Sequence, residues 1–92
     1  MALLHCHIEE GPRQGFKTIG VASVEGHSEY LTIEEKFLVK RGEDRLLAVK
    51  IIGKDPQQKI VLVQLPYEAD SGANRVWVKS EALFTESSEV LS

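Results

Sequence analysis

A polar loop near the end of the chain collects side chains that are suited to recognising another molecule. Residues 66–75 join two apolar segments and are rich in turn formers. If a strand follows, Arg75 and Trp77 share one face, which places a planar hydrogen-bond donor beside an aromatic ring. Both residue types are enriched at the energetic centres of protein interfaces, and loops on rigid sheets often perform recognition. We therefore predict a binding site made of Tyr67, Glu68, Asp70, Asn74, Arg75 and Trp77, with the glycine loop of residues 11–16 nearby.

The alternative interpretation of the same residues is structural. Arg75 would pair with Asp70 or Glu68 to fix the loop in place. Trp77, the one tryptophan of the chain, would fill an end of the core. The two interpretations differ in whether Arg75 and Trp77 remain accessible to a partner.

Three potential metal ligands, His5, Cys6 and His7, follow one another near the N-terminus. In a strand both histidines project to one face, about 7 Å apart, while Cys6 points to the other face. A third ligand would have to come from elsewhere: His27, Glu9 or Glu29. We expect instead two exposed histidines on an edge strand and Cys6 packed as a small hydrophobe, and so predict no metal and no cofactor.

The sequence contains no residue arrangement that is typical of catalysis. The serines lie outside any G-x-S-x-G strand-to-helix turn, which positions a nucleophilic serine. Gly11, Gly15 and Gly20 lack the spacing of a phosphate loop and its Gly-Lys-Ser/Thr ending. The adjacent carboxylates at 9–10 and 34–35 would face opposite ways in a strand. We predict a protein that is not an enzyme.

Length and composition fit one small globular domain. The chain has 92 residues, of which 42% are hydrophobic. We expect this domain to span residues 1–84, with a frayed tail at 85–92 that has little to bury. A single cysteine excludes an intramolecular disulfide, and no segment approaches the roughly 20 apolar residues of a membrane span. We expect a cytoplasmic protein without membrane contact, bound to another protein or to a second copy through an exposed edge strand.

Basic residues concentrate in the middle of the chain and support a second hypothesis. Phosphates would contact Lys36, Lys40, Arg41, Arg45 and Lys50, with Tyr30 or Phe37 as a stacking platform for bases. The formal net charge of −3 and the acids between these bases favour a solvated surface of mixed sign. Single-stranded nucleic acid therefore stands as the alternative partner.

Alternation of apolar and polar residues predicts a set of short strands. The two most regular ones, 45–52 and 59–65, are apolar on both faces, which predicts central strands covered on both sides. We expect others at 3–8, 18–24, 37–41 and 75–79, a tight turn at 41–44, and a strand end at Pro66. Thr32 and Glu35 match a capping box, so residues 32–36 form either a short helix or an irregular turn.

The end of the domain resembles the closing part of SH3-like barrels. It consists of a strand, RVWV, then a helical turn around Ser80 and the apolar pair Leu83 and Phe84. The likeness is confined to this closing part and carries over no binding residues. Together with turns about every ten residues, it predicts an all-β fold, a small five- to six-stranded SH3-like barrel or meander with one short helical turn.

Overall fold

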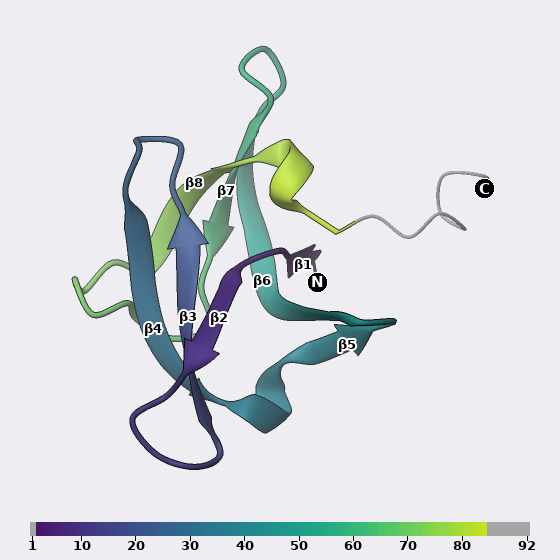
Figure 1. Cartoon of the computed structure of the whole chain (residues 1–92). Coiled ribbons are helices and arrows are strands. Elements are labelled where there is room, and N and C mark those ends of the chain that lie inside the picture. The colour runs from purple at the N-terminus through teal and green to yellow at the C-terminus, as the bar shows by residue number, and fades with distance from the viewer. Residues whose placement is uncertain (1, 85–92) are drawn as a thin grey trace.

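The computed structural model describes residues 2–84, and nearly all of its regular structure is β (Figure 1). Eight strands pair in antiparallel fashion, so the predicted all-β class is confirmed. The strands are β1 (Ala2–Leu4), β2 (His7–Glu10), β3 (Phe16–Ala22), β4 (Ser28–Glu34), β5 (Val39–Arg41), β6 (Asp44–Asp55), β7 (Ile60–Gln64) and β8 (Arg75–Lys79). Two 3-10 helices of one turn each, η1 (Glu35–Phe37) and η2 (Ser80–Ala82), follow β4 and β8.

The larger sheet has five strands and is organised around β6. Its order is β1-β6-β7-β8, and β5 also pairs with β6. Along its length β6 pairs first with β5, then with β1 and finally with β7, starting at the pair Lys50 and Gln64. A bulge between Ile51 and Gly53 leaves Ile52 without a partner on β7. β6 bends sharply where its pairing with β5 ends and its pairing with the other strands begins (Figure 1).

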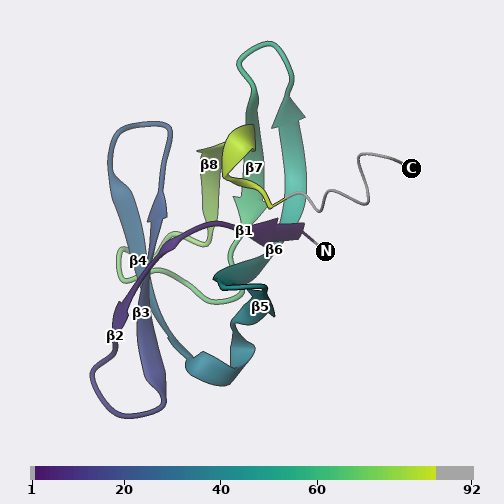
Figure 2. The same ribbon diagram turned by 45° about the vertical axis from the view of Figure 1, so that its right-hand side comes forward.

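The smaller sheet has the order β2-β3-β4 and covers one face of the larger one (Figure 2). In β4 buried and exposed residues alternate, with Leu31 and Ile33 pointing inward. On β3, Ile19 and Val21 do the same. Period-2 burial of this kind is what an antiparallel sheet with one wet face requires.

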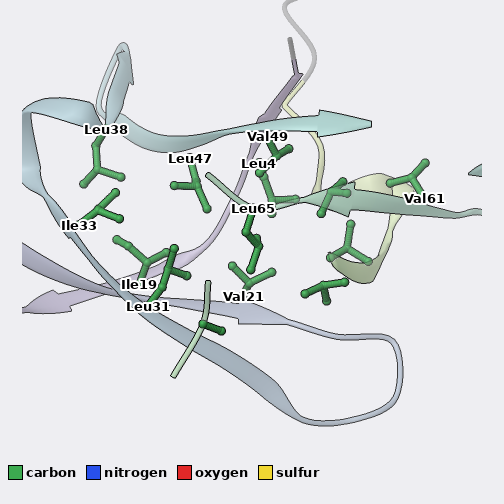
Figure 3. Close-up of a cluster of buried hydrophobic side chains, with 14 residues drawn as sticks. Leu4, Ile19, Val21, Leu31, Ile33, Leu38, Leu47, Val49, Val61 and Leu65 are labelled. Carbon is green, nitrogen blue, oxygen red and sulfur yellow. The ribbon is translucent and has the colours of Figure 1, made fainter. Parts of the chain in front are cut away.

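The core fills the space between the two sheets (Figure 3). The larger sheet contributes inward side chains from β6, β7 and β8, and the smaller sheet contributes those of β3 and β4. Leu4 lies at the centre and is fully buried. Within residues 2–84 the sheets remain two separate layers and do not close into a barrel. The likeness to SH3-like barrels therefore stays a prediction.

Two expectations for the first half of the chain are wrong. The predicted strand at 3–8 is broken, because the chain leaves the larger sheet after Leu4 and enters the smaller sheet at His7. The apolar alternation runs unbroken through this crossing, so it could not reveal it. Thr32 caps no helix but lies in β4 opposite Thr18, and the 3-10 turn begins only at Glu35. Burial of the alternate residues of β4 outweighs the local capping signal.

The expectations for the second half are closer to the structure. The hairpin of β6 and β7, the turn before Asp44 and the strand at 75–79 are confirmed. The strand before Pro66 ends at Gln64, because proline has no N–H for the ladder. The outward residues of β7 are only half-buried, so its predicted cover on both sides is wrong. The predicted tail at 85–92 lies outside the described residues.

Candidate functional site

The loop between β7 and β8 is tied down along its length. The backbone N–H of Asp70 donates to the carbonyl of Tyr30 on β4, at 2.7 Å. Within the loop, the N–H of Ala69 donates to the carbonyl of Ala73, also at 2.7 Å. At its base, the N–H of Leu65 donates to the carbonyl of Asn74 at 2.8 Å. The side chain of Ala69 is buried in the core, so the loop is a fixed part of the fold.

A side-chain bond adds a second attachment of the loop to β4. Ser71 donates its hydroxyl to the carboxylate of Glu29, with Oγ 2.8 Å from Oε2. Glu29 is only 8% exposed, which is rare for a carboxylate and requires hydrogen-bonding partners. His27 lies on the other side, its Nε2 3.8 Å from Oε1. The carboxylate therefore stands between the hydroxyl and the imidazole, whereas a catalytic triad needs the imidazole in the middle.

Tyr67 forms a groove with residues that lie far away in the sequence. Its ring is 50% exposed and shares a small pocket of about 150 Å³ with the 48% exposed ring of Phe37 from η1. A second depression, of about 460 Å³, continues from this pocket. The two share Ala48 and Pro66, so they adjoin, and we treat them together as one groove. Its lining comprises Ile33, Phe37, Leu47, Ala48, Val49, Lys50, Gln64, Leu65, Pro66 and Tyr67, and we call it the Phe37–Tyr67 groove.

The groove follows β6 beyond the end of β7. The last pair between these strands is Lys50 with Gln64, and the groove begins there. The preceding residues of β6, Ala48 and Val49, pair with β1 on the opposite side. Pro66 stands where β7 would otherwise continue, so a stretch of β6 is bordered by a groove instead of a strand.

Arg75 and Trp77 lie on a different surface, the outer face of the larger sheet. Register places three rows of residues across β6, β7 and β8 on this face: Lys50, Gln64 and Arg75, then Gly53, Leu62 and Trp77, then Asp55, Ile60 and Lys79. Among the described residues no ion pair joins Arg75 to Glu68 or Asp70. Trp77 lies outside the core cluster. The described residues therefore show neither of the two contacts on which the structural alternative depends. We call this surface the Trp77 face.

The six predicted site residues thus separate between the groove, the loop and the Trp77 face. Tyr67 lines the groove, while Asp70 and Asn74 use backbone groups to hold the loop. Arg75 and Trp77 lie on the Trp77 face, and Glu68 is exposed on the loop. Sequence reasoning missed the part of β6 that lines the groove, and it named Phe37 only as a stacking platform. No local signal connects these segments, since they meet only in the folded chain.

Charge is divided between the two sheets. The strands of the five-stranded sheet carry seven basic and two acidic side chains, whereas those of the three-stranded sheet carry one basic and four acidic ones. The one base of the smaller sheet, Lys17, donates to Glu10 at 2.8 Å. This hydrogen bond lowers the pKa of Glu10 and raises the pKa of Lys17. Although the net charge of the chain is −3, the strands of the larger sheet are net basic and those of the smaller sheet are net acidic.

Two of the basic residues of the middle strands are paired with acidic side chains. Lys36 pairs with Glu34 at 3.3 Å, and Arg45 pairs with Glu35 at 3.3 Å. Across residues 2–84, Lys50 is without an ion pair. The two aromatic candidates also separate, because Tyr30 lies on the smaller sheet against Gly20.

The histidine and cysteine cluster is divided by the crossing between sheets. His5 packs edge-on against Phe84, with ring centroids 5.8 Å apart, while Nε2 of His7 lies 3.2 Å from Glu9. In the part of the chain that the structure describes, no group of three or more His, Cys, Asp or Glu could hold a metal ion. Cys6 packs against the core, and burial raises the pKa of its thiol to about 11.

Comparisons with protein-family models, with curated proteins and with solved structures returned no match. The described residues include no helix of the length and apolar character needed to cross a membrane. The groove and the Trp77 face are therefore interpreted from their own chemistry.

Proposed function

We propose that this chain is a non-catalytic interaction module that binds an extended peptide of another protein in the Phe37–Tyr67 groove. The observation that carries the proposal is the pair of half-exposed rings, Phe37 and Tyr67, facing one apolar pocket. Large aromatic side chains are normally buried, and a pair beside a groove suits recognition of an apolar side chain. The loop that holds Tyr67 is fixed before binding, which reduces the entropy cost of association.

The lining of the groove defines the chemistry of the peptide. The pocket end is formed by Ile33, Leu47 and Pro66 together with the two rings, so it accepts an aliphatic or proline side chain. The far end carries Lys50, which has no ion pair among the described residues. A peptide with an apolar residue followed by an acidic one complements both ends. The border of β6 favours an extended backbone conformation.

Amide chemical shifts provide the test. The full chain, labelled with 15N, is titrated with three decapeptides: a Leu-Pro centre flanked by Asp, the same centre flanked by Lys, and a Gly-Gly centre flanked by Asp. We expect saturable shifts around Phe37, Ala48 and Tyr67 with the first peptide only, with a dissociation constant of about 100 μM or tighter. Shifts confined to other parts of the chain, or no saturable binding, would overturn the proposal.

Substitutions distinguish binding in the groove from nonspecific binding elsewhere on the surface. Tyr67→Ala and Phe37→Ala should each weaken binding by at least about tenfold, as expected for aromatic residues at the centre of an interface. Tyr30→Ala is the matched control, because this ring is 46% exposed but lies on the smaller sheet. An equal loss in Tyr30→Ala would contradict a role for the groove.

We also propose that the fold is related to SH3-like barrels. After η2 the chain returns to the start of the domain: Leu83 bridges to Leu4, and the N–H of Phe84 donates to the carbonyl of Leu3 at 2.8 Å. This return of the last segment beside the first strand supports the relation. A homodimer through an edge strand remains a prediction that sedimentation would test.

A further inference from the structure

We propose that the Trp77 face binds single-stranded nucleic acid, with a base stacked on the indole ring and phosphates held by Arg75, Lys79 and Lys50. This surface lies on the side of the larger sheet that faces away from the smaller sheet (Figure 2). It adjoins the far end of the groove, with which it shares Lys50 and Gln64, but it includes no residue of the pocket between Phe37 and Tyr67. The inference therefore does not depend on peptide binding in that pocket.

The indole ring of Trp77 extends across the larger sheet from β8 towards β6. Cη2, at the far end of the ring, is 3.8 Å from the position that a Cβ atom would take at Gly53. Gly53 is on β6 and Trp77 on β8, and both are paired with Leu62 of β7 between them. Two strand spacings separate β6 from β8 by about 10 Å, so the side chain must cross over Leu62 to reach Gly53.

This orientation leaves a stacking surface. The ring passes over the row of Leu62, and its tip ends beside Gly53 at ordinary van der Waals distance. The tryptophan is only half-buried, and among residues 2–84 no ring or cation stacks on it. A partly exposed aromatic ring on the outer face of a sheet is the kind of surface on which bases of single strands stack.

Cations surround the ring on the same face. Arg75 and Lys79 are two residues before and after Trp77 on β8, about 13 Å apart along the strand. Lys50 stands across from Arg75, with Gln64 between them. Unlike the paired cations Lys17, Lys36 and Arg45, these three make no ion pair with a described residue.

Acidic groups close to this face are few. Asp55 shares the last row with Lys79, but its carboxylate accepts hydrogen bonds from the backbone and the side chain of Gln58. Glu81 lies beyond the end of β8, in η2. The local charge is therefore positive although the chain as a whole is acidic, as an anionic polymer requires.

The combination of charge and a flat ring favours nucleic acid over an acidic peptide. Both would neutralise the three cations, but a carboxylate-rich peptide has no aromatic ring to stack on the indole. Stacking on an aromatic ring tolerates every base, so we expect little sequence preference. The acidic peptide is the competing outcome of the test.

Fluorescence of the only tryptophan gives a direct readout. The full chain is titrated with a ten-nucleotide oligothymidylate at about 20 mM salt, and binding is repeated up to about 200 mM. We expect quenching of the Trp77 fluorescence. The logarithm of the association constant should fall with the logarithm of the salt concentration with a slope of about −2, for three phosphate contacts on a single strand. Decaglutamate is titrated in parallel and should neither quench the indole nor displace the oligonucleotide.

Matched variants connect binding to this face. Lys79→Gln should weaken binding by about threefold and reduce the steepness of the salt dependence by about 0.7. Lys40→Gln is the same charge change on β5, at a cation that makes no ion pair with a described residue, and it should have no effect. Trp77→Leu keeps an apolar contact for Leu62 and should weaken binding at least about fivefold through lost stacking. Because Lys79 is exposed, its variant keeps the test valid if Trp77→Leu fails to fold.

Three results would overturn the inference. The first is absence of quenching and of binding at about 20 mM salt. The second is an equal loss in Lys40→Gln and Lys79→Gln, which would mean unspecific attraction. The third is displacement of the oligonucleotide by decaglutamate at equal concentration, which would assign the face to acidic peptides.

Discussion

The hydroxyl of Ser71 donates to both carboxylate oxygens of Glu29, at 2.8 and 3.1 Å, across 42 residues of sequence. This pair attaches the loop of the larger sheet to β4 of the smaller one. The neighbouring bond from the N–H of Asp70 to the carbonyl of Tyr30 acts between the same elements. Together they fix the segment from which Tyr67 projects toward Phe37.

Ser71→Ala should destabilise the domain and loosen the loop. The substitution removes the hydroxyl donor and leaves a nearly buried carboxylate without that partner, which costs about 1–3 kcal/mol. Urea unfolding measures the loss, and hydrogen exchange should show a faster rate at the amide of Asp70. Ser28→Ala, an exposed serine at the start of β4, is the control and should change neither quantity. Unchanged exchange at Asp70 in Ser71→Ala would mean that the backbone bond alone holds the loop.

Gly11→Ala should destabilise the turn between β2 and β3. A Cβ atom at Gly11 would lie 2.4 Å from the carbonyl oxygen of Phe16, which accepts a hydrogen bond from the N–H of Gly11 itself. The clash is with backbone, so relief requires breaking the turn, and we expect a loss of about 3 kcal/mol in urea unfolding. Gly26→Ala meets open space and carries only the strain of φ = 94°, about 1 kcal/mol. Equal losses in the two variants would show that the clash is relieved without cost.

Cys6 should make the stability of the domain depend on alkaline pH. Burial raises the pKa of its thiol from 9.0 to about 11, against a smaller opposing effect of a hydrogen bond from the Leu47 backbone. The pKa is higher in the folded state, so this contribution is complete below pH 9 and is lost as the pH rises to 11. After allowance for partial exposure, the loss is on the order of 1–2 kcal/mol.

Comparison with Cys6→Ala isolates this titration. Lysine and tyrosine groups titrate in the same range, but they are common to both proteins. The difference in unfolding free energy between wild type and variant should therefore shrink between pH 9 and pH 11. A constant difference over this range would mean that the thiol ionises as easily in the folded chain as in the unfolded one.

The second half of the fold was more predictable than the first because its signals are local. The hairpin of β6 and β7 has long apolar runs, a proline turn and a terminating Pro66, all readable within a few residues. In the first half, β4 was overlooked because the capping pattern of Thr32 competes with an alternation that only pairing with β3 makes decisive. Similarly, the crossing between Leu4 and His7 changes sheets without changing the apolar pattern.

The candidate sites depend even more on the tertiary structure. That Arg75 and Trp77 share a face follows from strand geometry alone. Which face of the larger sheet is exposed to solvent depends on where the smaller sheet packs. The groove needs Phe37 of η1 beside Tyr67, 30 residues later in the numbering, and only the folded chain brings them to one pocket. Residues that were predicted as one site therefore belong to two surfaces.

By itself the sequence determined the all-β class, the strands from 45 onward, and the fact that Arg75 and Trp77 share one face of β8. These features follow from period-2 alternation, proline and turn residues, which act over short distances. The tertiary structure alone decided how the strands divide into two sheets, which sheet carries the positive charge, and which exposed aromatic rings meet. Those outcomes depend on the burial of one face of each sheet against the other, a long-range packing energy that no local pattern contains.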